Sequence, residues 1–206
     1  MQLRYQTGLT GEQYVSAEAW REARLDRCPN HPRGGCSFAR HGTYERRTPA
    51  GTLIARWYCP ESHQTFSLLP DCLAARLPGT LARLEEVVAH AEQAPSLMAA
   101  ADHLRGYEVQ LPGAMRWVRR RVILVQHVLR LVIGLLPQLA GCRAEITACR
   151  TRLGADAVLV TLRSLTDRWL ATLAAPLGFH PHGITEGNPS FGRQHHPGAF
   201  GPAADP

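Results

Sequence analysis

The stretch that decides the fold is residues 28–70, CPNHPRGGCSFARHGTYERRTPAGTLIARWYCPESHQTFSLLP. It begins with the motif CPNH at 28–31, and the motif CPESH follows at 59–63. Each spacing lets a cysteine and a histidine reach one tetrahedral metal ion from a tight turn. The segment between the two motifs is short, polar and basic, and it is too small to bury a core of its own. The sequence therefore predicts a metal-stabilised β-hairpin of the zinc-ribbon type.

The two motifs and their surroundings offer more ligands than one tetrahedral ion needs. The five candidates are Cys28, His31, Cys36, Cys59 and His63. One set is Cys28, His31, Cys59 and His63, and in the other set Cys36 replaces His31. The preference of structural zinc for thiolate favours Cys36, whereas the tighter spacing favours His31, so both sets stay open. Four protein ligands leave no position for a water molecule, and we therefore expect a structural Zn²⁺.

The residues between the motifs have the pattern of a strand, a turn and a returning strand. Residues 38–47 are expected to form the first strand. Residues 48–51, TPAG, favour a turn because proline fixes φ and glycine permits a positive φ. Residues 53–58 are rich in β-branched and aromatic side chains, which indicates a returning strand that ends at the second motif. Residues 64–69 continue as a third short strand.

Outside this region the apolar residues recur with a helical period. The expected helices are 16–25 with Ser16 as N-cap, 79–93, 97–105, a long helix from 112 to 136, 138–153 and 155–175. The fold class is α+β, mainly α with a small β zinc ribbon. The expected units are a lead-in at 1–27, the zinc ribbon at 28–71, a helical domain at 72–136, C-terminal helices at 137–176 and a disordered tail at 177–206.

A short helix followed by a long one suggests a helix-turn-helix. Arg116, Arg119 and Arg120 share a face near the N-terminal end of the long helix, which is the part of a recognition helix that enters the major groove. The alternative is an ordinary helical hairpin with a solvated arginine face, because the loop 106–111 is longer than the usual tight turn. The apolar stripe from Val118 to Leu136 is expected to pack within the chain, with a dimer seam as the alternative.

The charge of the chain favours a polyanionic partner. Among the 206 residues the formal net charge is +6, and all 23 basic residues are arginines. The arginine fork matches phosphate oxygens and guanine edges in two-point geometry. The start of the chain has no secretory signal pattern, so we expect the cytoplasm, at the bacterial nucleoid. The apolar run 122–136 is shorter than the roughly 20 residues needed to span a bilayer, and no membrane partner is expected.

Catalytic patterns are missing from the sequence. The acidic residues fall on expected helices or turns, so no strand-borne set converges on a divalent metal as in a nuclease. Glycine-rich phosphate loops, nucleophile elbows and His-Glu-x-x-His helices are also absent. We expect a protein that is not an enzyme. The alternative is a metal-dependent enzyme with an open site that uses three of the five candidate ligands.

The motifs resemble a known family over residues 28–70. The run CSFARHGTYERR (36–47), the run IARWYC (54–59) and the ending HQTFSLLP (63–70) resemble the N-terminal zinc ribbon of insertion-sequence proteins. In that family a helix-turn-helix commonly follows, and the resemblance is faint over 71–136 and does not cover 137–206. This chain departs from the family pattern because His31 and His63 stand where the common form has cysteine, and because three residues separate Cys59 from His63.

The resemblance implies a DNA-binding, transposon-associated protein without its own catalytic domain. Double-stranded DNA is then the expected partner. The residues expected to contact phosphates from the hairpin are Arg40, Arg46, Arg47 and Arg56, and those expected to contact the groove are Arg116, Arg119 and Arg120. The alternative is a protein-binding adaptor or transcriptional regulator that docks a transposase, or a second copy of itself, through the zinc ribbon and the apolar helix.

Overall fold

The hairpin forms one side of a mixed β-sheet. The computed structural model describes residues 1–104 and 113–180, and within them four strands pair in the order β1-β4-β3-β2. Their bounds are Gln2–Tyr5 for β1, Ala39–Arg46 for β2, Thr52–Cys59 for β3 and Gln64–Pro70 for β4. Strands β2, β3 and β4 are antiparallel neighbours, whereas β1 runs parallel to β4. The three strands expected from the sequence are therefore present, and Gly51 in the turn has the positive φ of +76°.

The first 27 residues contribute more to the fold than the expected lead-in helix. Strand β1 pairs with β4, and helix α1 spans Gly11–Ser16. Thr10 is the N-cap, because its hydroxyl accepts from the Gln13 backbone while the Gln13 side chain accepts from the Thr10 backbone. The expected helix at 16–25 with Ser16 as N-cap is wrong, since this capping box starts the helix earlier and Ser16 is its last residue.

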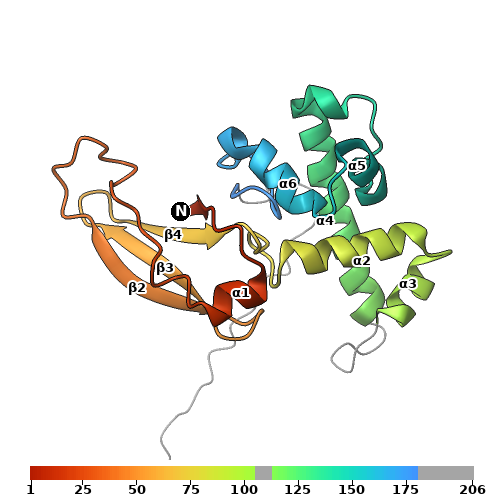
Figure 1. Ribbon diagram of the computed structural model, residues 1–206, viewed down its shortest axis with the longest axis horizontal. Helices are drawn as coiled ribbons and strands as arrows, with labels where there is room; N and C mark the ends of the chain where they lie inside the picture. The colour runs from red at the N-terminus through yellow and green to blue at the C-terminus, as the bar shows by residue number, and fades with distance from the viewer. Residues whose placement is uncertain (105–112, 181–206) are drawn as a thin grey trace, which may run out of the picture.

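The remaining helices follow the sheet and form the other half of the molecule, whereas α1 lies beside the strands (Figure 1). They are α2 (Leu81–Gln93), α3 (Leu97–His103), α4 (Gly113–Leu135), α5 (Ile146–Leu153) and α6 (Val158–Leu165), with 3₁₀ turns η1 (Pro137–Leu139) and η2 (Asp167–Trp169). Helices α2, α3 and α4 match the expected ones closely. The expected helices 138–153 and 155–175 are shorter in the structure, because Gly141 takes a φ of +76° before α5 and the chain leaves α6 at Thr166. Gly154 ends α5 in the left-handed conformation, as glycine commonly does.

The apolar stripe of α4 is buried within the chain. Val118, Val125, Leu129 and Val132 are almost fully buried, and α4 packs against both α2 and α3. A continuous apolar cluster runs from the sheet, including Phe66, to the helices. Within the described ranges, 1–104 and 113–180, no helix is long and apolar enough to cross a membrane.

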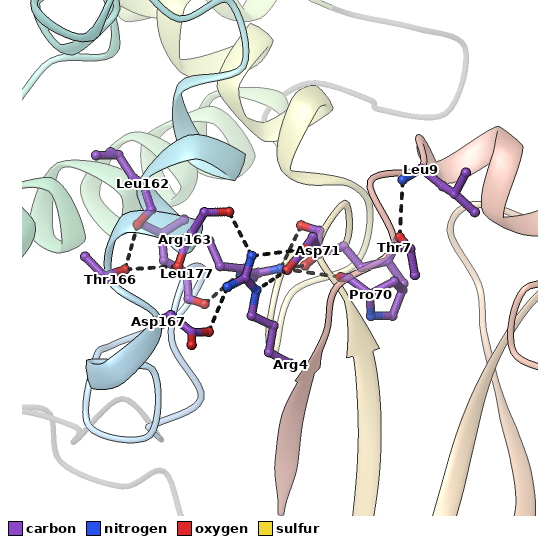
Figure 2. Close-up of polar contacts among 12 residues, drawn as sticks. Arg4, Thr7, Leu9, Pro70, Asp71, Leu162, Arg163, Thr166, Asp167 and Leu177 are labelled. Atoms are coloured by element: carbon purple, nitrogen blue, oxygen red, sulfur yellow. Dashed lines mark hydrogen bonds and ion pairs between the residues drawn. The ribbon is translucent and has the colours of Figure 1, made fainter. Parts of the chain in front are cut away.

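A buried arginine joins the sheet to the C-terminal helices (Figure 2). Arg163 of α6 is 0 % exposed, and its guanidinium donates to the backbone carbonyls of Asp71, Leu73 and Leu177 at 2.9, 2.6 and 3.0 Å. Burial lowers the pKa of Arg163 to about 10, although the nearby Asp71 carboxylate opposes this change. The side chain therefore satisfies several buried carbonyls at once, which an apolar residue could not do.

A second arginine reinforces this junction from the sheet side. Arg4 of β1 donates to the Asp71 carboxylate at 2.7 Å and to the Asp167 carboxylate at 2.8 Å. Leu177 and Phe179 are buried against the same region, so the first residues of the expected tail are packed as far as Phe179. The rest of the expected tail, 181–206, lies outside the described residues.

Candidate metal centre

Four of the five candidate ligands lie together at one end of the hairpin. The ligand atoms of Cys28, His31, Cys36 and Cys59 all lie within 4.8 Å of one another. The His31 Nδ1 atom is 3.6 Å from the Cys28 Sγ and 3.4 Å from the Cys59 Sγ. In a tetrahedral zinc site, metal–sulfur bonds of about 2.3 Å and metal–nitrogen bonds of about 2.0 Å place sulfur and nitrogen about 3.6 Å apart. The distances from His31 to both sulfurs thus fit one tetrahedral ion.

The loop before β2 supplies three of the four ligands. The His31 backbone N–H donates to the Cys28 carbonyl at 3.1 Å, which closes a tight turn with Pro29 at its second position. Gly34 and Gly35 follow with φ angles of +83° and +85°, a conformation that residues with a Cβ rarely adopt. These two glycines turn the chain so that Cys36 returns to the side chains of the first turn.

The fourth ligand, Cys59, is the last residue of β3 and is 0 % exposed. Burial raises the pKa of its thiol, but hydrogen bonds from the Ser62 side chain and backbone, and then from Cys28 and Cys36, outweigh burial and lower it to about 6. Burial and hydrogen bonds to Cys59 and Cys28 raise the pKa of the Cys36 thiol. The hydrogen bonds to Cys59 therefore favour its thiolate, which is the form that binds a metal.

A polar contact connects the two turns behind the ligands. The Asn30 side chain donates to the Ser62 hydroxyl at 3.0 Å, and Ser62 in turn donates to the Cys59 sulfur. Sequence reasoning missed both residues. The sequence contained a signal for Ser62, because a hydroxyl three positions after a cysteine in a tight turn can donate to the cysteine sulfur. Such outer contacts orient the ligands of metal sites.

The fifth candidate, His63, lies outside this group. Its backbone has a φ of +49°, and its Nδ1 atom is 3.1 Å from the Tyr58 hydroxyl. Both ligand sets expected from the sequence contained His63. The structure instead gathers the three cysteines with His31, so the two rival candidates, His31 and Cys36, occur in the same group.

Two hairpin arginines expected to contact phosphates are engaged with the protein itself. Arg40 donates to the carbonyls of Trp20 and Arg21 at 2.6 and 3.0 Å, and its guanidinium lies over the Trp57 ring. Arg46 donates to two carbonyls of the segment after β4, and burial lowers its pKa. These contacts use donors that a phosphate would need.

The other hairpin arginines differ from each other. The Arg56 guanidinium lies 5.8 Å from the Tyr44 ring centroid, and one Nη donates weakly to the Thr43 carbonyl at 3.5 Å. The Arg56 Nε atom is buried without a partner among the residues that the structure describes. Arg47, at the turn between β2 and β3, is exposed.

The arginines at the start of α4 lie away from the metal centre. Arg116, Arg119 and Arg120 are exposed, and no ion pair involves them within residues 1–104 and 113–180. The loop 106–111, on which the helix-turn-helix prediction partly depends, lies outside the described residues. The candidate residues therefore form two sets that lie apart. The metal ligands are at the end of β3, and the arginines are on the first turns of α4.

Three thiols and one imidazole can hold one metal ion with protein ligands alone. Cys28 and Cys59 are buried, while His31 and Cys36 are half-buried, so the ligand atoms converge in a partly enclosed site. None of the protein-family models, curated proteins or solved structures with which the chain was compared matches it.

Proposed function

We propose that the ion held by Cys28, His31, Cys36 and Cys59 is a structural Zn²⁺. Three soft thiolates and an imidazole form a ligand set that favours zinc over the hard cations Mg²⁺ and Ca²⁺. Four protein ligands complete the tetrahedron and leave no position for a water molecule, which is the arrangement of structural sites. The convergence of the four ligand atoms within 4.8 Å is the observation that carries this proposal.

The zinc ion would connect two parts of the chain. The loop 28–36 has no strand or helix of its own, whereas Cys59 belongs to the sheet. Binding one ion to both parts would hold the loop against the end of β3. Metal binding to such a small element contributes directly to its folding free energy.

The protein as a whole is proposed to bind double-stranded DNA. The net charge of +6 and the exposed Arg116, Arg119 and Arg120 on the first turns of α4 support this proposal. The packing of α3 and α2 against α4 agrees with a helix-turn-helix in which α4 is the recognition helix. Arg47, at the turn between β2 and β3, would add a phosphate contact. Arg40 and Arg46 are less available for such a contact, because they already donate to carbonyls.

The biological setting is proposed from the resemblance of residues 28–70 to the zinc ribbon of insertion-sequence proteins. The chain would act in transposition as a DNA-binding accessory protein without catalysis of its own. The competing adaptor role has one observation in its favour, because Ile123 and Leu131 on α4 are 53 % and 41 % exposed. A docked transposase or a second copy of the chain could cover them.

Fluorescence anisotropy with a random-sequence duplex tests the DNA proposal. Counterion release predicts that log K falls linearly with log salt between about 50 and 200 mM. Replacement of all three arginines, Arg116, Arg119 and Arg120, by alanine should weaken binding and reduce the steepness of that line, whereas Arg130→Ala, an exposed arginine later on α4, serves as the matched control. No binding at low salt would reject the DNA proposal, and self-association without DNA binding would favour the adaptor.

A further inference from the structure

A pocket of about 410 Å³ lies where the segment between β4 and α2 meets the first half of α4. Arg76 enters it from the segment after the sheet, and Arg116, Arg120 and Arg121 enter it from the helix. No acidic side chain is among the described residues that line it. The pocket is thus lined by four arginines from two parts of the chain that are distant in sequence.

Helical spacing explains why these arginines of α4 share the pocket. Positions 116 and 120 are four residues apart and lie one above the other on the helix surface, and Arg121 lies one turn after Trp117, which also lines the pocket. Arg119 does not line the pocket. On the first turns of α4, the exposed Arg116 and Arg120 therefore line the pocket, whereas the exposed Arg119 does not.

Two of the four guanidinium groups are held in place by protein contacts. The Arg121 guanidinium lies 3.5 Å from the centroid of the Trp117 ring and donates to the Trp117 carbonyl at 3.2 Å. The Nε atom of Arg76 donates to the Phe179 carbonyl at 3.1 Å. These contacts position the side chains but supply no negative charge, and no acidic side chain among the described residues lines the pocket.

The electrostatics of the pocket support an anionic ligand. Burial lowers the pKa of Arg121 to about 10, and the positive charges of Arg120 and Arg83 lower it as well. Within residues 1–104 and 113–180, none of the four pocket arginines forms an ion pair. A bound anion would relieve the mutual repulsion of these groups.

We infer that this pocket binds a phosphate group of the DNA backbone through Arg76, Arg116, Arg120 and Arg121. Guanidinium forks bind phosphate oxygens in two-point geometry, and several forks around one phosphate are typical of phosphate recognition. The inference rests on the proposed DNA binding and makes it more specific. Arg116 and Arg120 would contact backbone rather than bases, and Arg119 would be the arginine directed at the groove.

The test uses the full-length, zinc-loaded protein and anisotropy with a labelled random-sequence duplex across a salt series. Arg76→Gly removes one guanidinium, and glycine suits the φ of +56° at that position. The double variant Arg116→Ala/Arg120→Ala removes two more, and Arg130→Ala on the exposed part of α4 is the control. Each lost phosphate contact should reduce the steepness of log K against log salt by about one and weaken binding about tenfold. Thermal unfolding by circular dichroism identifies any variant that fails to fold.

Pocket variants that bind the duplex as Arg130→Ala does, while the wild type shows salt-dependent binding, would overturn the pocket assignment and leave the DNA proposal standing. A wild type that binds no duplex would overturn the DNA proposal and, with it, the backbone phosphate. Titration with pyrophosphate and ATP tests whether the pocket binds the phosphate of a free nucleotide instead of the DNA backbone. If these ligands bind, and the pocket variants lose that binding but keep duplex affinity, the phosphate belongs to a free nucleotide and the backbone assignment is wrong.

Discussion

The Nδ1 atom of His31 lies 3.4 Å from the Sγ atom of Cys59, although the two residues are 28 positions apart in the sequence. This contact joins the turn of the first motif to the end of β3. His31, and not His63, is therefore the histidine that lies with the three cysteines of the candidate metal centre. The stability of the hairpin end should therefore depend on the ion that these two residues share.

Removal of the metal should destabilise the folded protein. A ligand that binds only the folded state at a free concentration 1,000-fold above its Kd stabilises that state by about 4 kcal/mol. Dialysis against a chelator should therefore lower the midpoint of thermal unfolding, and one equivalent of Zn²⁺ should restore it. Calorimetric scans of the chelated and the restored protein measure this difference. An unchanged midpoint after confirmed metal removal would argue against a structural ion.

Ser62→Ala should weaken metal binding without abolishing it. The substitution removes the hydroxyl donor to the Cys59 sulfur and the acceptor of Asn30, while the Ser62 backbone donor remains. Loss of an outer contact of this kind commonly lowers metal affinity 10- to 100-fold, and we expect about tenfold because one donor is kept. Competition with a chromophoric chelator measures the affinity. Glu61→Gln, in the same turn, is the control, and an equal loss in both variants would contradict the role of Ser62.

The metal-free protein should become more stable as the pH rises from about 6 to 9. The pKa of Cys59 is lowered to about 6 in the folded state from the ordinary value of 9.0, so in this window the unfolded chain holds a proton that the folded chain has released. The contribution is complete above pH 9 and is lost as the pH falls through 6. The raised pKa of Cys36 acts above pH 9, outside this window.

Urea unfolding of the chelated protein across this pH range measures the effect. Cys59→Ser should flatten the dependence of the unfolding midpoint on pH, because serine does not ionise in the window. If the dependence were the same in Cys59→Ser as in the wild type, another group would be its source.

Arg163→Met should destabilise the protein by at least about 3 kcal/mol, because several buried carbonyls lose their donor at once. The affected carbonyls include those of Asp71, Leu73 and Leu177. Arg163→Lys should cost less, since an ammonium group keeps the charge and some of the bonds. Urea denaturation measures both variants, and Arg130→Met, an exposed change on α4, should alter stability by less than about 0.5 kcal/mol. Equal stability of Arg163→Met and the wild type would contradict the bridging role of this side chain.

Local signals in the sequence were sufficient for much of the fold. The turn residues 48–51 placed the hairpin correctly, because proline and glycine act on the backbone at their own positions. Pro137 and Gly154 likewise marked the ends of α4 and α5. Strand β1 could not be predicted in this way, since it is four residues long and pairs with β4, more than 60 positions away.

The site was harder to predict than the fold, because spacing does not determine the direction of a side chain. His63 has a suitable spacing to Cys59, yet the left-handed backbone at His63 directs its ring to Tyr58. The arginines posed the same difficulty, as Arg40 and Arg46 make carbonyl contacts that only the tertiary fold creates. For Arg163 a signal existed, since a single charged residue in the mostly apolar helix Val158–Leu165 suggests a buried partner.

Native mass spectrometry of the intact protein and two histidine variants tests the metal centre most directly. The account predicts one zinc ion per chain in the wild type and in His63→Ala, and a loss of zinc in His31→Ala during exchange against a chelator. The folded state of each variant is checked by circular dichroism after zinc is added back. A wild type without metal, or zinc retained by His31→Ala and lost from His63→Ala, would contradict the account.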